Sequence, residues 1–229
     1  MSTTINSSRV GNAIGFNSNF TTARQTANTV SDGTFSNTAA ISYQFSAGRG
    51  GGTHRFQRSF IHFDVSSVTG TVSSAQLRLL GNTNTSSDLI VLKSTAFGGD
   101  GGTALSSTDY FTNTDYSTAY SAEVTSWSTT SNNITLNSTA ESDIQNNNDF
   151  IVAIVNHNND FSNSAAGSST TQNSGLNLSS LSNARLIFTE TAIAAGPTNL
   201  TSLNTIAKAS IISFNTIALA NIDEINTVS

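Results

Sequence analysis

The stretch of sequence that decides the fold is HRFQRSFIHFDVSSVTGTVSSAQLRLL, which runs from His54 to Leu80. In its first half, Phe56 and Phe60 fall on one face of an alternating pattern. The other face carries a second apolar set: Ile61, Phe63 and Val65. A strand that is apolar on both faces must be covered on both, so the pattern predicts a central strand of a sheet.

Short apolar runs on either side of this stretch have the length and period of further strands. They fall at residues 41–45, 73–80, 88–94, 134–136, 150–155 and 184–190. The run FIVAIV at 150–155 is the strongest candidate for a buried strand. The chain thus offers roughly eight strands, without the long amphipathic helices that a parallel α/β sheet requires. The sequence therefore predicts an all-β fold, an antiparallel jelly-roll β-sandwich.

A short helical turn is expected after the strand at 134–136. Ser138-Thr139-Ala140-Glu141 has the spacing of a capping box, in which Ser138 and Glu141 satisfy each other's backbone donors. This turn should end at the asparagines 146–148.

The composition supports a folded β protein with many turns. Ser, Thr and Asn together make up about 42% of the chain, and these types suit strands and turns. Hydrophobic residues account for 36%, enough for one core, whereas disordered segments combine low hydrophobicity with high net charge. The formal net charge is −5 and the nine basic residues are scattered, which disfavours nucleic-acid binding. The absence of cysteine excludes disulfides, Cys-ligated zinc and thiol chemistry.

The N-terminal residues MSTTINSSRV have neither the basic nor the apolar segment of a secretory signal. No window approaches the roughly 18 apolar residues of a membrane span. A surface-type composition without an export signal is expected of a protein that is made in a host cytoplasm and released by lysis as part of a virion. A fragment of a longer protein, or export by another route, is the alternative.

The sequence changes character after a short linker and then repeats itself. We expect a sandwich over residues 1–193, a linker at 194–200 that contains the only proline, and a tail at 201–229. The tail repeats LNTIAKASIIS, FNTIALANIDE and INTVS with a period of 11 residues. Such a period can describe a right-handed helical supercoil, but Asn-Thr pairs are poor helix formers, which favours an extended or β-type segment.

The apolar positions of so short a tail cannot bury themselves. Internal repeats indicate units that stack or self-associate, so the tail should dock on a neighbouring chain or pair with copies of itself. The expected assembly residues are Leu203, Ile206, Phe214, Ile217, Ile222, Ile225 and Val228.

The deciding stretch resembles the central signature of the DNRLRE-type, carbohydrate-binding-module-like β-sandwiches. In that family an Arg-aromatic strand leads into an FD(L/V)S turn, a G-x-V-x-x-A link and an L-x-L strand. The matching residues here are Arg58, Phe60, Phe63-Asp64-Val65-Ser66, Gly70, Val72, Ala75, Leu77 and Leu79. The likeness continues more weakly to ARLIFTE at 184–190, although the family's opening motif is not evident in the N-terminal residues. It implies a jelly-roll sandwich of secreted and surface-attached proteins, often an accessory to glycan-active enzymes.

The tail carries a second resemblance, because its repeats are similar to the Ile-Asn-Gly-Val-Ala-type repeats that end many phage virion proteins. Together with the missing signal peptide, this resemblance favours a bacteriophage virion structural protein, a capsid decoration or fibre-like component attached through its tail. Its partners would be other virion proteins and further copies of itself. A glycan-binding module that recognises the host surface is the alternative, and the two roles are compatible.

The sequence singles out no catalytic residues, and neither enzyme activity nor a cofactor is expected. His62, Asp64 and any serine could be assembled into a hydrolase triad, but no G-x-S-x-G nucleophile elbow is present. We expect His62 to be a packed or an edge residue of a strand, His54 to be a solvated loop residue, and Asp64 to cap a turn rather than bind calcium. Six other acidic residues are spread through expected loops, and no two of them stand out as a catalytic pair: Asp109, Asp115, Glu123, Glu141, Asp143 and Asp149.

Two further segments have features of a metal or phosphate site. His157 could join Asp160 at a metal site, but one His and one Asp beside amides are common in turns, so no metal is expected. GGDGG at 98–102 lacks the Lys and Ser/Thr of a phosphate loop and is interpreted as a flexible turn.

The best candidates for ligand contact are four aromatic residues in the polar region 98–121: Tyr110, Phe111, Tyr116 and Tyr120. Exposed aromatic faces suit sugar stacking or protein binding. Ordinary core packing of these rings is the alternative. Trp127 is expected to be buried.

Overall fold

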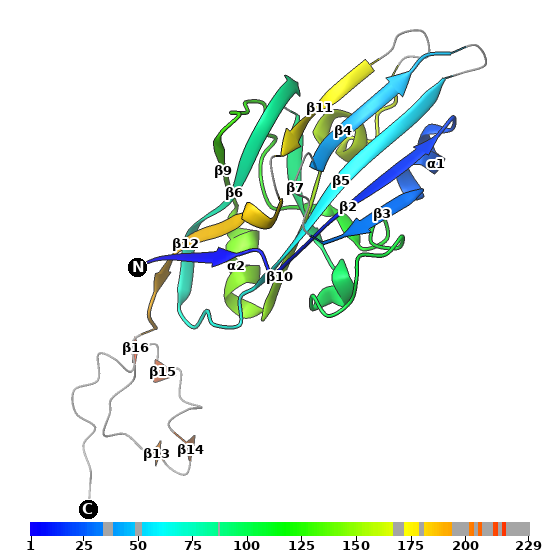
Figure 1. Ribbon diagram of the computed structural model, residues 1–229. Helices are drawn as coiled ribbons and strands as arrows, with labels where there is room; N and C mark the ends of the chain where they lie inside the picture. The colour runs from blue at the N-terminus through cyan, green and yellow to red at the C-terminus, as the bar shows by residue number, and fades with distance from the viewer. Residues whose placement is uncertain are drawn as a thin grey trace, which may run out of the picture. The chain divides into compact units, whose positions relative to one another are not determined.

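The computed structural model describes residues 1–33, 39–48, 52–86, 88–166, 172–178 and 181–193, and four short strands further along the chain (Figure 1). The chain divides into two compact units, Met1–Thr191 and Ala192–Ser229. The longer strands belong to the first unit, and the short ones to the second.

Strands dominate the first unit, which confirms the all-β prediction. In chain order they are β1 (Ser2–Asn6), β2 (Arg9–Asn17), β3 (Thr29–Asp32), β4 (Ala39–Ser46), β5 (Thr53–Asp64), β6 (Thr71–Ser86), β7 (Leu89–Ser94), β8 (Thr114–Ala119), β9 (Ser131–Thr135), β10 (Asp149–Asn156), β11 (Gln172–Leu178) and β12 (Arg185–Thr191). The helices are α1 (Phe20–Gln25) and α2 (Ser138–Asn146), with single turns η1 (Phe97–Gly99), η2 (His157–Phe161, a π-helical turn) and η3 (Leu181–Asn183). None of the helices in the described residues is long and apolar enough to cross a membrane.

The strands form two antiparallel sheets, as the sequence predicts. One sheet has the order β1-β12-β6-β9. The other is built on β5, which pairs with β2 along one edge and with β4 and β10 along the other. β3 extends this second sheet beyond β2, and β7 and β8 extend it beyond β10. β11 joins β4 to the far end of β6, so the long strand β6 takes part in both sheets.

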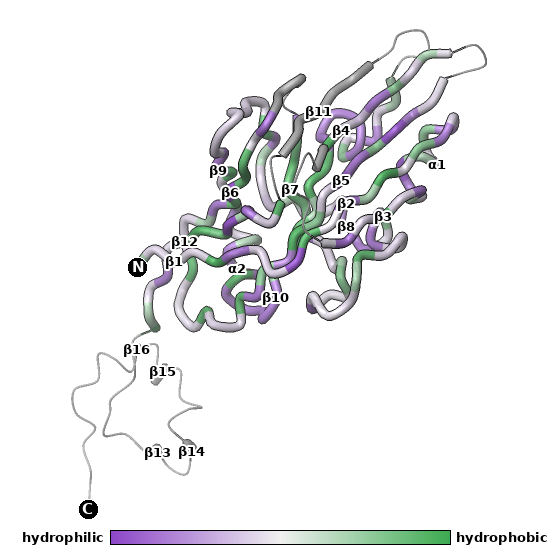
Figure 2. Tube along the Cα trace, viewed as in Figure 1, coloured by the Kyte–Doolittle hydropathy of each residue, from purple (hydrophilic) through white to green (hydrophobic). Residues whose placement is uncertain are grey.

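The first hydrophobic core lies between the two sheets. β5 contributes Ile61 and Phe63 to it, and β6 contributes Leu77 and Leu79 from the opposite sheet. All four side chains are buried, and burying each one stabilises the fold by about 1.5–3 kcal/mol. Figure 2 shows how apolar residues recur along the strands.

A second core lies on the other face of the β5 sheet. Phe56 and Phe60 of β5 belong to it, so the two apolar faces of this strand do enter two different cores. The cover on this side comes from α1 and from the segment after β7, through Ala23, Phe97, Leu105 and Tyr110. The β5 sheet is therefore buried by a sheet on one face and by a helix and a long connection on the other.

The start of α2 differs from the prediction. Asn137, not Ser138, is the N-cap, and its side chain accepts a hydrogen bond from the backbone N–H of Ala140. Glu141 does not close a capping box, because its Oε1 accepts a hydrogen bond from the backbone N–H of Ala75 in β6, 3.1 Å away. The acidic side chain thus ties the helix to the neighbouring sheet instead of to its own first turn.

Five strands have no counterpart among the predicted ones: β1, β2, β3, β8 and β11. β1 reads STTIN and β11 reads QNSGLNL, so each has too few apolar residues to show a period of two. Their pairing partners in the sheets, rather than their own hydrophobic pattern, account for their extended conformation.

In the second unit, the described strands form two small hairpins. β13 (Ser202–Leu203) pairs antiparallel with β14 (Ile206–Ala207), and β15 (Ser213–Phe214) with β16 (Ile217–Ala218). The hairpins occupy equivalent positions of successive repeats. The predicted linker at 194–200 and three predicted assembly residues lie outside the described residues: Ile222, Ile225 and Val228.

Candidate functional site

The four aromatic residues predicted to contact a ligand pack against the two cores. Tyr110 is fully buried and Tyr120 is 2% exposed, whereas Phe111 and Tyr116 are half-buried. Tyr116 belongs to β8 rather than to a loop. The expectation of exposed aromatic faces is wrong for Tyr110 and Tyr120, because Tyr110 packs in the core on the second face of the β5 sheet and Tyr120 in the core between the two sheets. Ligand binding by Phe111 and Tyr116 stays a prediction. Trp127 is buried, as predicted.

A buried ion pair lies against Tyr110 and Tyr116 of this aromatic segment. Arg58 of β5 is fully buried, and its Nε and Nη2 bond the two carboxylate oxygens of Asp160 at 2.6 and 2.8 Å. Arg24 of α1 brings a second cation, with its Nε 3.3 Å from Asp160 Oδ1. Tyr116 Oη donates a hydrogen bond to that oxygen at 3.0 Å, and the Tyr110 ring lies 3.9 Å from the Arg58 guanidinium carbon. A buried guanidinium requires such bidentate pairing and ring contact, because it stays charged.

The phenol groups of this cluster stay protonated. Burial raises the pKa of Tyr110 and of Tyr116, and the nearby Arg58 cation offsets this only in part. Tyr110 Oη donates a hydrogen bond to the carbonyl oxygen of Ala23, 2.8 Å away, which connects the segment to α1. We interpret the cluster as structural, because its polar groups are bonded to one another and to the backbone.

The predicted environment is wrong for His54 and is confirmed for Asp64. His54 is predicted to be a solvated loop residue, which is wrong: it lies in β5, is 8% exposed, and its Nδ1 lies 2.8 Å from Tyr43 Oη. Asp64 accepts hydrogen bonds from the backbone N–H and the hydroxyl of Ser66, which confirms its predicted role in a turn.

His62 is buried in β5, which is one of its two predicted environments, and it joins Ser8 and Asp149 in a line of hydrogen bonds. Ser8 Oγ lies 2.6 Å from His62 Nδ1, and His62 Nε2 lies 2.8 Å from Asp149 Oδ1. These are the residue types of a hydrolase triad, but the imidazole is reversed, since in the chymotrypsin arrangement Nε2 faces the serine. Ser8 Oγ also lies 3.0 Å from the carbonyl oxygen of His62. We interpret the line as a connection between β5, β10 and the residue before β2.

The acidic residues predicted to lie in loops are partly in regular elements: Glu141 and Asp143 in α2, Asp115 in β8 and Asp149 in β10. Asp143 and Asp149 line one polar pocket of about 280 Å³. Desolvation acts to raise the pKa of Asp143, but hydrogen bonds from Lys93 Nζ, at 2.8 Å, and from Tyr120 Oη bring it below its ordinary value. Both carboxylates of the pocket are thus engaged by side chains of the protein.

The GGDGG segment forms a tight turn beside His62. Gly98, Gly99 and Gly101 have φ values of 81°, 85° and 73°, in the left-handed region that favours glycine. A Cβ at Gly101 would lie only 2.4 Å from His62 Cε1, so the turn packs directly on the imidazole.

An exposed groove that the sequence pattern does not reveal lies on β2, β3, β4 and β5. It measures about 400 Å³ and is lined by Ile14, Phe16, Thr29, Gln44, Ser46, Thr53 and Arg55. Phe16 is 47% exposed, and it is paired in register with Arg55, which is paired in turn with Gln44. An exposed ring beside a guanidinium and an amide can stack on the apolar face of a sugar and bond its hydroxyl groups.

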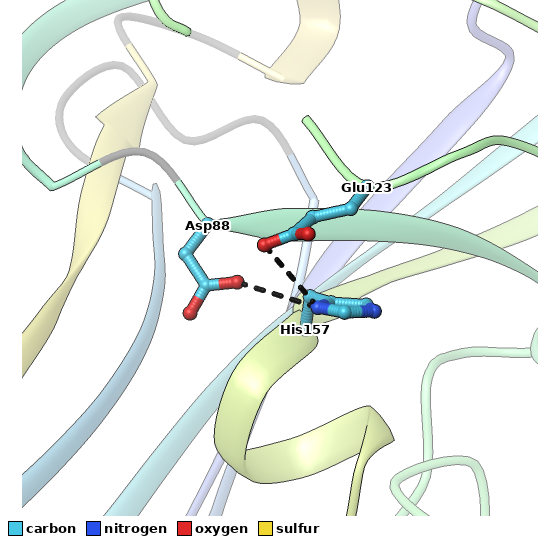
Figure 3. A group of neighbouring side chains, drawn as sticks. All are labelled: Asp88, Glu123 and His157. Atoms are coloured by element: carbon cyan, nitrogen blue, oxygen red, sulfur yellow. Dashed lines mark ion pairs between the residues drawn. The ribbon is translucent and has the colours of Figure 1, made fainter. Parts of the chain in front are cut away.

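A second surface group brings one histidine and two carboxylates together from three distant segments (Figure 3). Asp88 precedes β7, Glu123 follows β8, and His157 follows β10. His157 Nδ1 lies 3.3 Å from Glu123 Oε1 and 3.9 Å from Asp88 Oδ1. Imidazole and carboxylate are both metal ligands. Asp160, which the sequence suggests as the partner of His157, is bonded to Arg58 instead.

Comparison with known proteins assigns no function to these sites. No protein-family model matches the chain, and no curated protein matches it. That the chain belongs to the DNRLRE-type sandwiches stays a prediction.

Proposed function

We propose that the protein is a bacteriophage virion structural protein, a capsid decoration or fibre-like component, which displays its sandwich and is attached through its C-terminal repeats. It is made in the host cytoplasm and released with the virion by lysis. Its partners are other virion proteins and further copies of itself. The sandwich has jelly-roll topology, as in the DNRLRE-type modules, and it binds rather than catalyses.

The repeated hairpins of the tail carry the proposal. Each hairpin has strands of two residues, and an isolated two-stranded hairpin is at best marginally stable in water. Leu203 is opposite Ile206 in the first hairpin, and Phe214 is opposite Ile217 in the second. Apolar pairs of this kind gain most when repeats stack on one another or when a neighbouring chain covers them.

Removal of residues 197–229 tests this role. The first unit has its own hydrophobic cores, so the truncated protein should stay folded but should fail to join particles. Full incorporation of the truncated protein into particles would sink the proposal.

Point variants in the tail show whether incorporation requires its apolar pairs or only the presence of the tail. Leu203→Asp combined with Phe214→Asp should block incorporation. Ser202→Asp combined with Ser213→Asp is the matched control, because it places the same charges on the polar positions of the same strands. The copy number of the protein in purified particles, measured by mass spectrometry, then distinguishes the head, with hundreds of copies, from the tail, with a handful.

A second candidate function is a carbohydrate-binding or adhesion module for host-surface glycans, and the Phe16 groove favours it. The ring of Phe16 is exposed, and beside it Arg55 supplies a guanidinium and Gln44 an amide. This function and attachment to a virion are compatible, since the groove lies on the first unit and the repeats on the second.

Substitutions in the groove test glycan binding. Phe16→Ala and Arg55→Ala should each weaken binding of host polysaccharide at least about tenfold, a loss of ~1.4 kcal/mol, with an unchanged Tm. Ile193→Ala is the control, because it removes an exposed apolar side chain that does not line the groove. A glycan array without any bound glycan would exclude this function, and binding that survives both groove substitutions would exclude the groove as its site.

A further inference from the structure

The carboxylate–histidine cluster of Asp88, Glu123 and His157 takes no part in the proposed function (Figure 3). We propose that these three residues bind a divalent transition-metal ion of the zinc class. The site would join three segments that are far apart along the chain: the residue before β7, the connection after β8, and the first residue after β10.

The spacing of the three ligand atoms fits a single ion. Zinc binds imidazole nitrogen and carboxylate oxygen at about 2.0–2.2 Å, so two ligands at a tetrahedral angle lie roughly 3.4 Å apart. The distances from His157 Nδ1 are 3.3 Å to Glu123 Oε1 and 3.9 Å to Asp88 Oδ1. The three atoms all lie within 4.8 Å of one another, so small side-chain movements bring them to the spacing that one ion requires. Three protein ligands leave the fourth tetrahedral position to water.

The orientation of Asp88 is fixed by its own hydrogen bonds. Asp88 is 5% exposed; its Oδ2 accepts from Asn156 Nδ2 at 2.9 Å and its Oδ1 from the backbone N–H of Asn158 at 3.1 Å. Partners of this kind hold a ligating carboxylate in place and contribute to metal affinity. Glu123 and His157 have side chains 32% and 23% exposed, so an ion can reach the cluster from solvent.

The donor set selects the class of ion. Calcium and magnesium prefer oxygen ligands in larger number, whereas imidazole suits zinc and its neighbours in the transition series. Two carboxylates beside one imidazole leave the cluster net negative, and a divalent cation neutralises it. The ion would also reinforce a backbone connection, because Asp88 and Glu123 immediately precede Leu89 and Val124, which form a β-bridge.

Zinc titration of the chelator-treated full-length protein tests the site. Calorimetry should show one zinc ion per chain, and zinc at a hundredfold excess over its Kd should raise the Tm by about 5–10 °C. Calcium under the same conditions should produce neither effect. A wild-type protein that does not bind zinc, or that responds equally to calcium, would overturn the proposal.

Three variants locate the ion. Glu123→Gln and His157→Gln should each weaken zinc binding at least about tenfold, because each removes a ligand from a surface position. Asp100→Asn, which alters an exposed carboxylate outside the cluster, is the matched control and should bind zinc as the wild type does. Near-ultraviolet circular dichroism without metal verifies that each variant is folded. If both cluster variants keep wild-type zinc affinity, the ion lies elsewhere and the site is wrong.

Discussion

At the scale of single residues, Arg58 and Asp160 show how a buried charge determines its surroundings. Burial acts to lower the pKa of Arg58, but the adjacent Asp160 carboxylate outweighs this effect and keeps the pKa above its ordinary value. The arginine is therefore charged under all ordinary conditions and depends on its carboxylate partner. The two residues are 102 positions apart, so no local pattern in the sequence could pair them.

Loss of that partner should be costly. We expect Asp160→Asn to lower the free energy of unfolding by about 3–5 kcal/mol, because the guanidinium of Arg58 then stays buried without a counter-charge. Urea unfolding followed by tryptophan fluorescence measures the change. Asp100→Asn, at an exposed carboxylate, should change stability by less than about 0.5 kcal/mol. A double variant in which Arg58→Met accompanies Asp160→Asn should recover part of the loss; equal losses in the single and double variants would contradict this explanation.

At the scale of elements, the sequence predicts well where hydrophobic alternation is strong. β5 and β10 carry apolar residues on both faces, and both strands are buried on both faces. The pattern shows that a second cover must exist but not which segment supplies it. That segment, which includes Tyr110, has no regular hydrophobic period, so its sequence is equally compatible with exposed and with buried aromatic side chains. Tertiary packing on the β5 sheet decides their burial.

The N-cap of α2 gives a prediction for one element. Asn137→Ala should destabilise the protein by about 1 kcal/mol, because the backbone N–H of Ala140 loses its acceptor. Ser138→Ala should be nearly neutral, since Ser138 is exposed and is not the cap. Chemical unfolding of the two variants side by side makes the comparison. A larger loss for Ser138→Ala would restore the capping box that the sequence suggests.

At the scale of the whole molecule, the candidate sites were the least predictable feature. The carboxylate–histidine cluster draws on residues 88, 123 and 157, and the groove draws on β2, β3, β4 and β5. Each depends on strand register, which fixes which side chains become neighbours, and register cannot be read from a polar strand without alternation. The sequence indicates His157 as a possible ligand, but its partners become its neighbours only because β7, β8 and β10 lie side by side.

The pKa values of the carboxylates in the folded protein predict how the stability of the whole molecule depends on pH. Several of them have a pKa below its ordinary value: Asp32, Asp64, Asp115, Asp143 and Glu190. For Asp32 the main cause is the hydrogen bond from the Arg9 guanidinium, whose Nη2 lies 2.8 Å from Asp32 Oδ2. A lowered pKa means that the folded state binds fewer protons than the unfolded chain at acidic pH.

Stability should therefore be highest above the unfolded carboxylate pKa values of about 4 and should fall as the pH drops through the lower values of the folded state. Urea unfolding between pH 7 and pH 2.5 measures this dependence. Asp32→Asn should be less stable than the wild type at pH 7, but the difference should shrink as the pH falls, because protonation removes the same ion pair from the wild type. Arg9→Met removes the other partner and should give the same convergence. A stability difference that stays constant across this range would show that the Arg9–Asp32 pair does not contribute to the acid sensitivity of the protein.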